Sequence, residues 1–160
     1  MSYDLLVFDP KIAPRDRTDF MSWYGNLTKW EEQRDYNSPI GMTGNLPMFF
    51  EQLRQEFPPM NGPFAYEFDQ AGPKPASFWQ KLFRAKQPST TPEPFNEALV
   101  TDYSLAENAI YMAFAWSVSD QAYNRVFNTA LSTGVGFFDV SANNGAILHD
   151  AGQFEDLMGL

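Results

Sequence analysis

Several short segments of the chain carry apolar residues on both of their faces when they are read as strands. Successive side chains of a strand point to opposite faces of a sheet, and in residues 3–9 both alternating sets are largely apolar. Residues 109–116 repeat this pattern, so both segments are predicted to be central strands. Further strands are expected at residues 100–105, an exposed edge of alternating polarity, and at 135–141, onto which the turn signal Asn144-Gly145 can fold residues 146–149.

Three other segments have the apolar spacing of helices, at i, i+3, i+4 and i+7. Asp16 is the expected N-cap of the first helix, and Asn45 begins the second. Ser119 is the expected cap of the third, which Gly134 ends. The three apolar stripes consist of Phe20, Trp23, Tyr24, Leu27 and Trp30, of Leu46, Phe49, Phe50, Leu53 and Phe57, and of Ala122, Tyr123, Val126, Phe127, Ala130 and Leu131.

Residues 61–97 differ in composition from the rest of the chain. Eight of the twelve prolines fall between Pro58 and Pro94, which predicts a long Pro-rich insertion. Within it, residues 76–86 predict a short amphipathic helix, and four basic side chains lie between residues 74 and 86 without an acidic one. The apolar face of this helix comprises Phe78, Trp79, Leu82 and Phe83.

The order of these elements predicts a single α+β domain over residues 1–160. It corresponds to a βαββαβ plan with a split first helical layer and the long insertion. The economical solution is a ferredoxin-like variant, a four-stranded, mainly antiparallel sheet with its helices on one face.

The composition narrows the classes of function. The formal net charge of −9 disfavours binding to nucleic-acid phosphates and favours basic partners, although it also serves solubility. The chain has no cysteine, so it holds neither disulfides nor thiolate zinc sites. It has no signal peptide at its start and no apolar run long enough for a membrane span, so a cytoplasmic protein is expected.

Few residues suggest catalytic chemistry. No glycine-rich phosphate loop or metal-ligand cluster is present, so neither a cofactor nor a metal is expected. The single histidine, His149, lacks the context of a catalytic base. Asp9 ends the first predicted strand and Asp139 lies inside the last one, so the two acids could meet at one end of the sheet and share a proton or a metal. The alternative is that both have structural roles, Asp9 in a turn and Asp139 in an ion pair or a cap.

Two stretches together resemble an uncharacterised family of small bacterial cytosolic proteins. The first is YDLLVFDP with the aromatic segment DFMSWYGNLTKW, and the second is VTDYSLAENAIYMAFAWS with its continuation to GVGFFDVS. This family is loosely associated with immunity proteins, which neutralise a partner toxin of bacterial competition systems. The resemblance implies a shared fold and a protein partner, and it implies no catalytic residue.

The leading hypothesis is therefore a non-enzymatic protein that occludes a basic toxin domain through an acidic surface. The first candidate surface comprises Glu31, Glu32, Asp35 and Tyr36, and the second comprises Asp102 and Glu107. One alternative is a small-ligand or hydrolytic domain that uses Asp9 and Asp139. Another is a structural subunit that forms a homodimer through the apolar face with Phe78 and Trp79.

Overall fold

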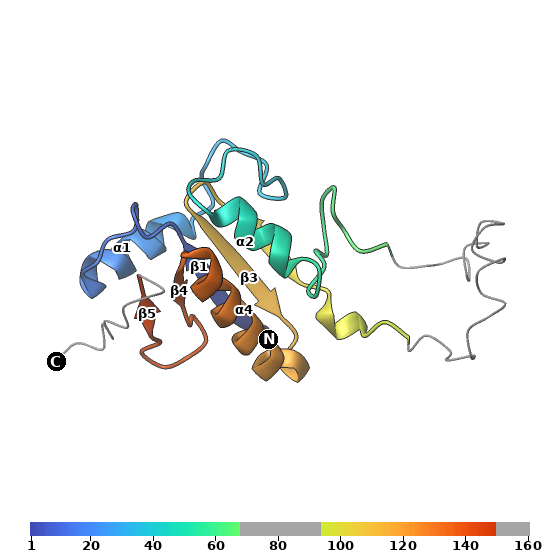
Figure 1. Cartoon of the computed structure of the whole chain (residues 1–160). Coiled ribbons are helices and arrows are strands. Elements are labelled where there is room, and N and C mark those ends of the chain that lie inside the picture. The colour runs from blue at the N-terminus through green and yellow to red at the C-terminus, as the bar shows by residue number, and fades with distance from the viewer. Residues whose placement is uncertain (68–93, 150–160) are drawn as a thin grey trace, which may run out of the picture. The chain divides into compact units, whose positions relative to one another are not determined.

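The computed structural model describes residues 1–67 and 94–149 (Figure 1). The chain divides into two compact units, residues 1–66 with 98–160, and residues 67–97. Within its described residues, the first unit holds an α+β arrangement of three α-helices and a five-stranded antiparallel sheet. None of the helices in the described ranges has both the length and the apolar character that a membrane span requires.

The sheet has the strand order β2-β3-β1-β4-β5, and each neighbouring pair is antiparallel. The predicted central strands are confirmed as central, and the predicted edge strand β2 lies at an edge. The prediction of four strands is wrong, because the segment after Asn144-Gly145 pairs with β4 as a fifth strand. The strands are β1 (Tyr3–Phe8), β2 (Asp102–Leu105), β3 (Ala109–Phe114), β4 (Gly136–Phe138) and β5 (Ile147–Leu148).

Helices cover both faces of the sheet, not one face as predicted. Helices α2 (Leu46–Leu53) and α4 (Ser119–Thr133) lie side by side over one face (Figure 1), where their apolar residues pack on Leu5 and Val7. Helix α1 (Arg17–Leu27) packs on the opposite face, against Leu6 and Phe8. Because both alternating sets of β1 are apolar, each needs its own cover, and the sheet consequently separates two cores.

Two of the predicted helix caps are confirmed and one is not. The Asp16 side chain accepts hydrogen bonds from the backbone amides of Thr18 and Asp19, so the predicted N-cap of α1 is confirmed. Gly134 ends α4 with a left-handed φ of 74°, also as predicted. Ser119 is instead the first residue of α4, after a 3₁₀ turn at Trp116–Val118, and makes no capping bond there.

The predicted helix at residues 76–86 lies outside the described residues, as do Phe78 and Trp79 and the remainder of the insertion between residues 68 and 93. Before that range, Pro59 forms an isolated parallel bridge with Thr101, the residue that precedes β2. Thr101 donates its backbone N–H to the Pro58 carbonyl at 2.9 Å, and Met60 donates to the Thr101 carbonyl at 2.8 Å. A short 3₁₀ helix at Glu97–Leu99 precedes β2. These bonds pair the backbone of Thr101 immediately before the edge strand β2.

Candidate functional site

The fold joins the two predicted acidic surfaces through a contact between Glu32 and Glu107. The segment after α1 runs beside β2 and the β2–β3 turn, where the Glu107 backbone N–H donates to Glu32 Oε2 at 2.9 Å. At the end of β2, the Leu105 backbone N–H donates to the Tyr36 carbonyl at 2.8 Å. We call the resulting surface the acidic rim. Its carboxylates belong to Glu31, Glu32, Asp35, Asp102 and Glu107, all exposed except the half-buried Glu32.

Arg34 and Tyr36 hold the acidic rim in place from beneath. The side chain of Arg34 is only 13% exposed, and its guanidinium donates to the carbonyls of Ser38 at 3.1 Å and Ile40 at 2.9 Å. The Tyr36 hydroxyl accepts the Glu32 backbone N–H at 2.9 Å. Because Arg34 is engaged with backbone carbonyls, it orders the loop and offsets the charge of the acidic rim only in part. The loop also presents Ile40, whose surface is 85% exposed.

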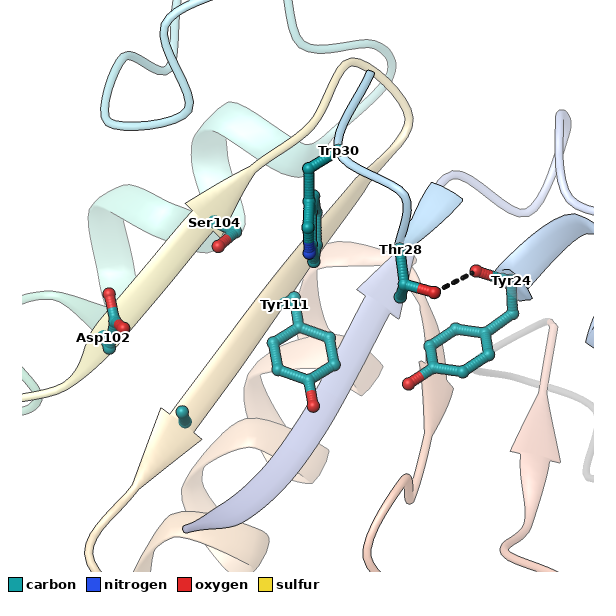
Figure 2. A pocket seen from close by; sticks show the side chains of 7 residues that line it. Tyr24, Thr28, Trp30, Asp102, Ser104 and Tyr111 are labelled. Atoms are coloured by element: carbon teal, nitrogen blue, oxygen red, sulfur yellow. Dashed lines mark hydrogen bonds between the residues drawn. The ribbon is translucent and has the colours of Figure 1, made fainter. Parts of the chain in front are cut away.

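A hollow of about 240 Å³ opens beside the acidic rim on the α1 side of the sheet (Figure 2). It exists because Ala113 of β3 is the cross-strand partner of both Asp102 on β2 and Asp4 on β1. A small residue between two longer ones leaves space above the sheet, which α1 does not fill. The lining residues are Tyr24, Thr28, Trp30, Asp102, Ser104, Tyr111 and Ala113.

Trp30 forms one wall of this hollow and has an unusual backbone. The stripe of apolar residues predicts Trp30 as part of the first helix, but α1 ends at Leu27 and Trp30 lies beyond it with a φ of 53°. A bulky residue in this left-handed region costs of order 1–3 kcal/mol, and such residues cluster at functional sites. The indole is held by T-shaped contacts with Tyr36 and Tyr111, at centroid distances of 5.4 Å and 5.8 Å.

Two of the hydroxyl groups around the hollow, those of Tyr111 and Thr28, donate their protons within the protein. Tyr111 donates to Asp4 Oδ2 at 2.7 Å, and Thr28 donates to the Tyr24 carbonyl at 3.0 Å (Figure 2). A further hydrogen bond joins the hydroxyls of Tyr111 and Tyr24. Burial, and then the neighbouring Asp4 carboxylate, raise the pKa of Tyr111, so this phenol stays protonated at neutral pH.

A second open hollow, of about 340 Å³, lies where the end of α1 and the segment after it meet Asn108. Its walls combine apolar and acidic side chains, as do those of the first. They are Trp23, Asn26, Leu27, Glu31, Glu32 and Asn108. The acidic rim therefore contributes a carboxylate to the wall of the first hollow and two to the wall of the second.

The fold does not bring Asp9 and Asp139 together. Phe8 pairs with Gly136 and Leu6 with Phe138, so the two acids lie beyond opposite ends of the β1–β4 pair, about 13 Å apart along the strands. Asp9 is buried and accepts the Lys11 backbone N–H at 3.0 Å in the turn after β1. Asp139 lies just after β4, not inside it, and accepts the Ala142 N–H at 3.2 Å. Both acids thus have structural roles.

The position of Asp139 gives a pH-dependent prediction. Burial raises its pKa above the usual value, against backbone hydrogen bonds from Ala142 and Ser141 that lower it. The folded state therefore holds the proton more tightly than the unfolded state, and stability falls as the pH rises through the folded-state pKa. Asp139→Asn, which is neutral and still accepts the Ala142 N–H, should be more stable than the wild type at pH 7 and equal to it near pH 3.

Urea unfolding of both proteins at the two pH values measures this difference. The exposed residue Asp120 provides the matched control, because Asp120→Asn removes the same charge without relieving any burial. An Asp139→Asn protein that gains nothing at pH 7 relative to pH 3 would contradict the prediction.

His149 is buried and not at the surface. It is 5% exposed, its Nε2 lies 2.6 Å from the Pro14 carbonyl oxygen, and its ring packs on Phe8 and Phe20. Its ring is thus part of the core on the α1 side. Within residues 1–67 and 94–149, no group of three or more carboxylate or imidazole side chains is placed to hold a metal ion.

No protein-family model matches the chain, and comparisons with curated proteins and with solved structures find no significant match. The candidate site consequently stands on its own geometry. Sequence reasoning found its carboxylates but missed Trp30, Tyr24, Ser104 and Tyr111. One signal pointed to the hollow, namely Tyr111 interrupting the small-residue face of β3 between Ala109 and Ala113.

Proposed function

We propose that this protein is a non-enzymatic, cytoplasmic partner-binding protein of the immunity type, which occludes a basic toxin domain through the acidic rim. The observation that carries the proposal is the convergence of carboxylates from two distant segments, joined by the bond from Glu107 N–H to Glu32 Oε2. The net charge of −9 gives the chain as a whole the same sign. The resemblance to small bacterial proteins associated with toxin immunity supports the same class of function.

The geometry suits docking of a folded basic protein. Opposite charge on two surfaces steers their encounter and fixes their register, while apolar anchors near the centre of an interface supply much of the affinity. The exposed side chain of Ile40 lies in the loop that Arg34 fastens, which follows Glu31, Glu32 and Asp35 in the chain. A partly rigid acidic surface with an apolar anchor can occlude a toxin without any reaction chemistry.

The remaining hypotheses have less support. A hydrolytic site that uses Asp9 and Asp139 together would require two acids that the register places at opposite ends of a strand pair. Self-association through Phe78 and Trp79 stays a prediction. For the fold, we propose that β1 to β4 with α2 and α4 form a ferredoxin-like variant, to which α1 and β5 are added. Such a fold serves many functions and does not by itself favour one of them.

The proposal predicts a charge-dependent association rate. Glu31→Gln combined with Glu107→Gln should slow association with the basic domain encoded beside this gene about tenfold at low salt, and should change the dissociation rate much less. Surface-based binding kinetics at several salt concentrations measure both rates. The expected gap between variant and wild type closes at high salt, where surface charges are screened.

A double variant with the same charge change on other surfaces is the control. Asp19 and Asp120 are exposed residues in the first turns of α1 and α4, and Asp19→Asn with Asp120→Asn should leave association within about twofold of wild type. The proposal fails if the wild-type protein does not bind the neighbouring toxin domain, or if both double variants slow association equally.

A further inference from the structure

We propose that the hollow lined by Trp30, Tyr111 and Asp102 receives the guanidinium group of a single arginine side chain of the partner protein. This inference rests on the proposed function and adds the chemistry of one contact to it. Four observations carry it: the volume of the hollow, the charge and donor inventory of its walls, the backbone of Trp30, and the second carboxylate on the same row of the sheet.

The volume points to one side chain. Sites for metabolites and drug-sized molecules occupy about 300–1,000 Å³ and enclose most of their ligand. The hollow is smaller, at about 240 Å³, and it is open to the surface. It suits the end of one long side chain that enters from a docked protein.

The walls select a cation that donates hydrogen bonds. Asp102 is exposed and carries the only formal charge among the seven lining residues. The hydroxyl protons of Thr28 and Tyr111 are donated within the protein, so these two hydroxyls offer oxygen lone pairs rather than donors. An anion would meet a carboxylate and few free donors. A guanidinium has five donors and a planar surface that stacks on aromatic rings.

The aromatic wall is preorganised. Trp30 keeps a left-handed φ of 53°, and its indole is fixed between the rings of Tyr36 and Tyr111. Nothing in the local sequence favours this conformation for tryptophan, since glycine or asparagine would normally occupy it. A side chain held in place at such a cost loses little further freedom when a ligand binds, which improves affinity.

A second carboxylate reinforces the negative potential under the hollow. Asp4 lies on the same row as Asp102, with Ala113 between them, and its Oδ1 is buried without a hydrogen-bond partner among the described residues. Tyr111 contacts its other oxygen, at 2.7 Å. Asp102 in the wall and Asp4, which Tyr111 contacts, therefore both favour positive charge in the hollow.

The test is a titration of the full, ¹⁵N-labelled chain with the capped tripeptide acetyl-Gly-Arg-Gly-amide at low ionic strength. The indole N–H signal of Trp30 and the amide signals of Asp102 and Ser104 should shift and saturate. The same peptide with citrulline, which keeps the shape but not the charge, should produce at most a tenth of the affinity. Equal binding of the citrulline peptide, or shifts confined to other residues, would overturn the inference.

Three variants localise the effect. Asp102→Asn should weaken binding of the arginine peptide about tenfold, whereas Asp120→Asn on α4 should leave it unchanged. Trp30→Gly removes the indole at a position whose φ glycine adopts freely, so the fold is retained while binding is lost. Unchanged binding by Asp102→Asn or by Trp30→Gly would refute an arginine in this hollow.

Binding of the arginine peptide and binding of the toxin domain test the two proposals separately. If the neighbouring toxin domain binds while the arginine peptide leaves Trp30 unshifted, the partner-binding function stands and the arginine contact is wrong. If the peptide binds at Trp30 and no toxin domain binds, the hollow is a guanidinium site and the immunity function is wrong.

Discussion

Phe8→Ala should lower the free energy of unfolding by about 3–5 kcal/mol, a large part of the 5–15 kcal/mol that a domain typically has. Phe8 is fully buried at the end of the central strand β1. Its ring centroid lies 5.0 Å from that of Phe20, 6.1 Å from Trp23 and 5.1 Å from His149. Removing the ring leaves a cavity where α1 meets the sheet, and urea denaturation measures the loss.

The residues beside Phe8 provide a sharper version of this experiment. Its cross-strand neighbours are Ala109 and Gly136, and a Cβ at residue 136 would overlap the Phe8 ring. Gly136→Ala alone should therefore cost about 1–3 kcal/mol through overpacking. In the double variant the ring is absent, so the added Cβ meets no obstacle. The double variant should therefore lose at least 1 kcal/mol less than the sum of the losses of the two single variants. Strict additivity would mean that the ring does not set the space at residue 136.

The elements with strong local signals could be predicted from the sequence. Asp16 stands before an aromatic stripe and caps α1, and the apolar faces of residues 3–9 and 109–116 mark the two central strands. The same two-sided pattern also requires cover on both faces of the sheet. The assumption of one helical layer ignored that requirement, and the position of α1 follows from it.

The boundaries of helices and strands were less predictable because tertiary contacts decide them. Trp30 continues the i, i+3, i+4 spacing of α1, yet the helix stops at Leu27, and Trp30 instead contacts Tyr36 and Tyr111. Those contacts involve residues that are distant in sequence. Likewise, Asp139 looked like an acid inside a strand, but β4 ends at Phe138.

The candidate site likewise has features that the sequence reveals and features that only the tertiary structure reveals. Its carboxylates were found as two separate groups because exposed acids are visible in a sequence, whereas the bond between Glu107 and Glu32 spans 75 positions of the chain. The hollow depends on the register that places Ala113 opposite Asp102 and Asp4. A shift by a single residue would turn these side chains to the other face, and no local pattern specifies that register.

Gly145→Ala should detach β5 from the sheet and cost about 1–3 kcal/mol. Gly145 is buried in the turn between β4 and β5, and a Cβ there would overlap the carbonyl oxygen of Asp139. Because the obstacle is backbone, no rotation of a side chain relieves it. The Gly145 carbonyl also accepts a hydrogen bond from Arg17 Nη1 at 3.0 Å, which links this turn to the start of α1.

Hydrogen exchange distinguishes a local opening from general destabilisation. Phe137 pairs with Leu148 and Phe138 with Ile147, so the amides of this strand pair should exchange faster in Gly145→Ala, while those shared by β1 and β3 should change less. Asn144→Gly is the control in the same turn. Asn144 has a φ of 54°, which glycine adopts at no steric cost, so this variant should stay within about 0.5 kcal/mol of wild type. Equal exchange at Leu148 in Gly145→Ala and wild type would show that the Asp139 carbonyl can move aside.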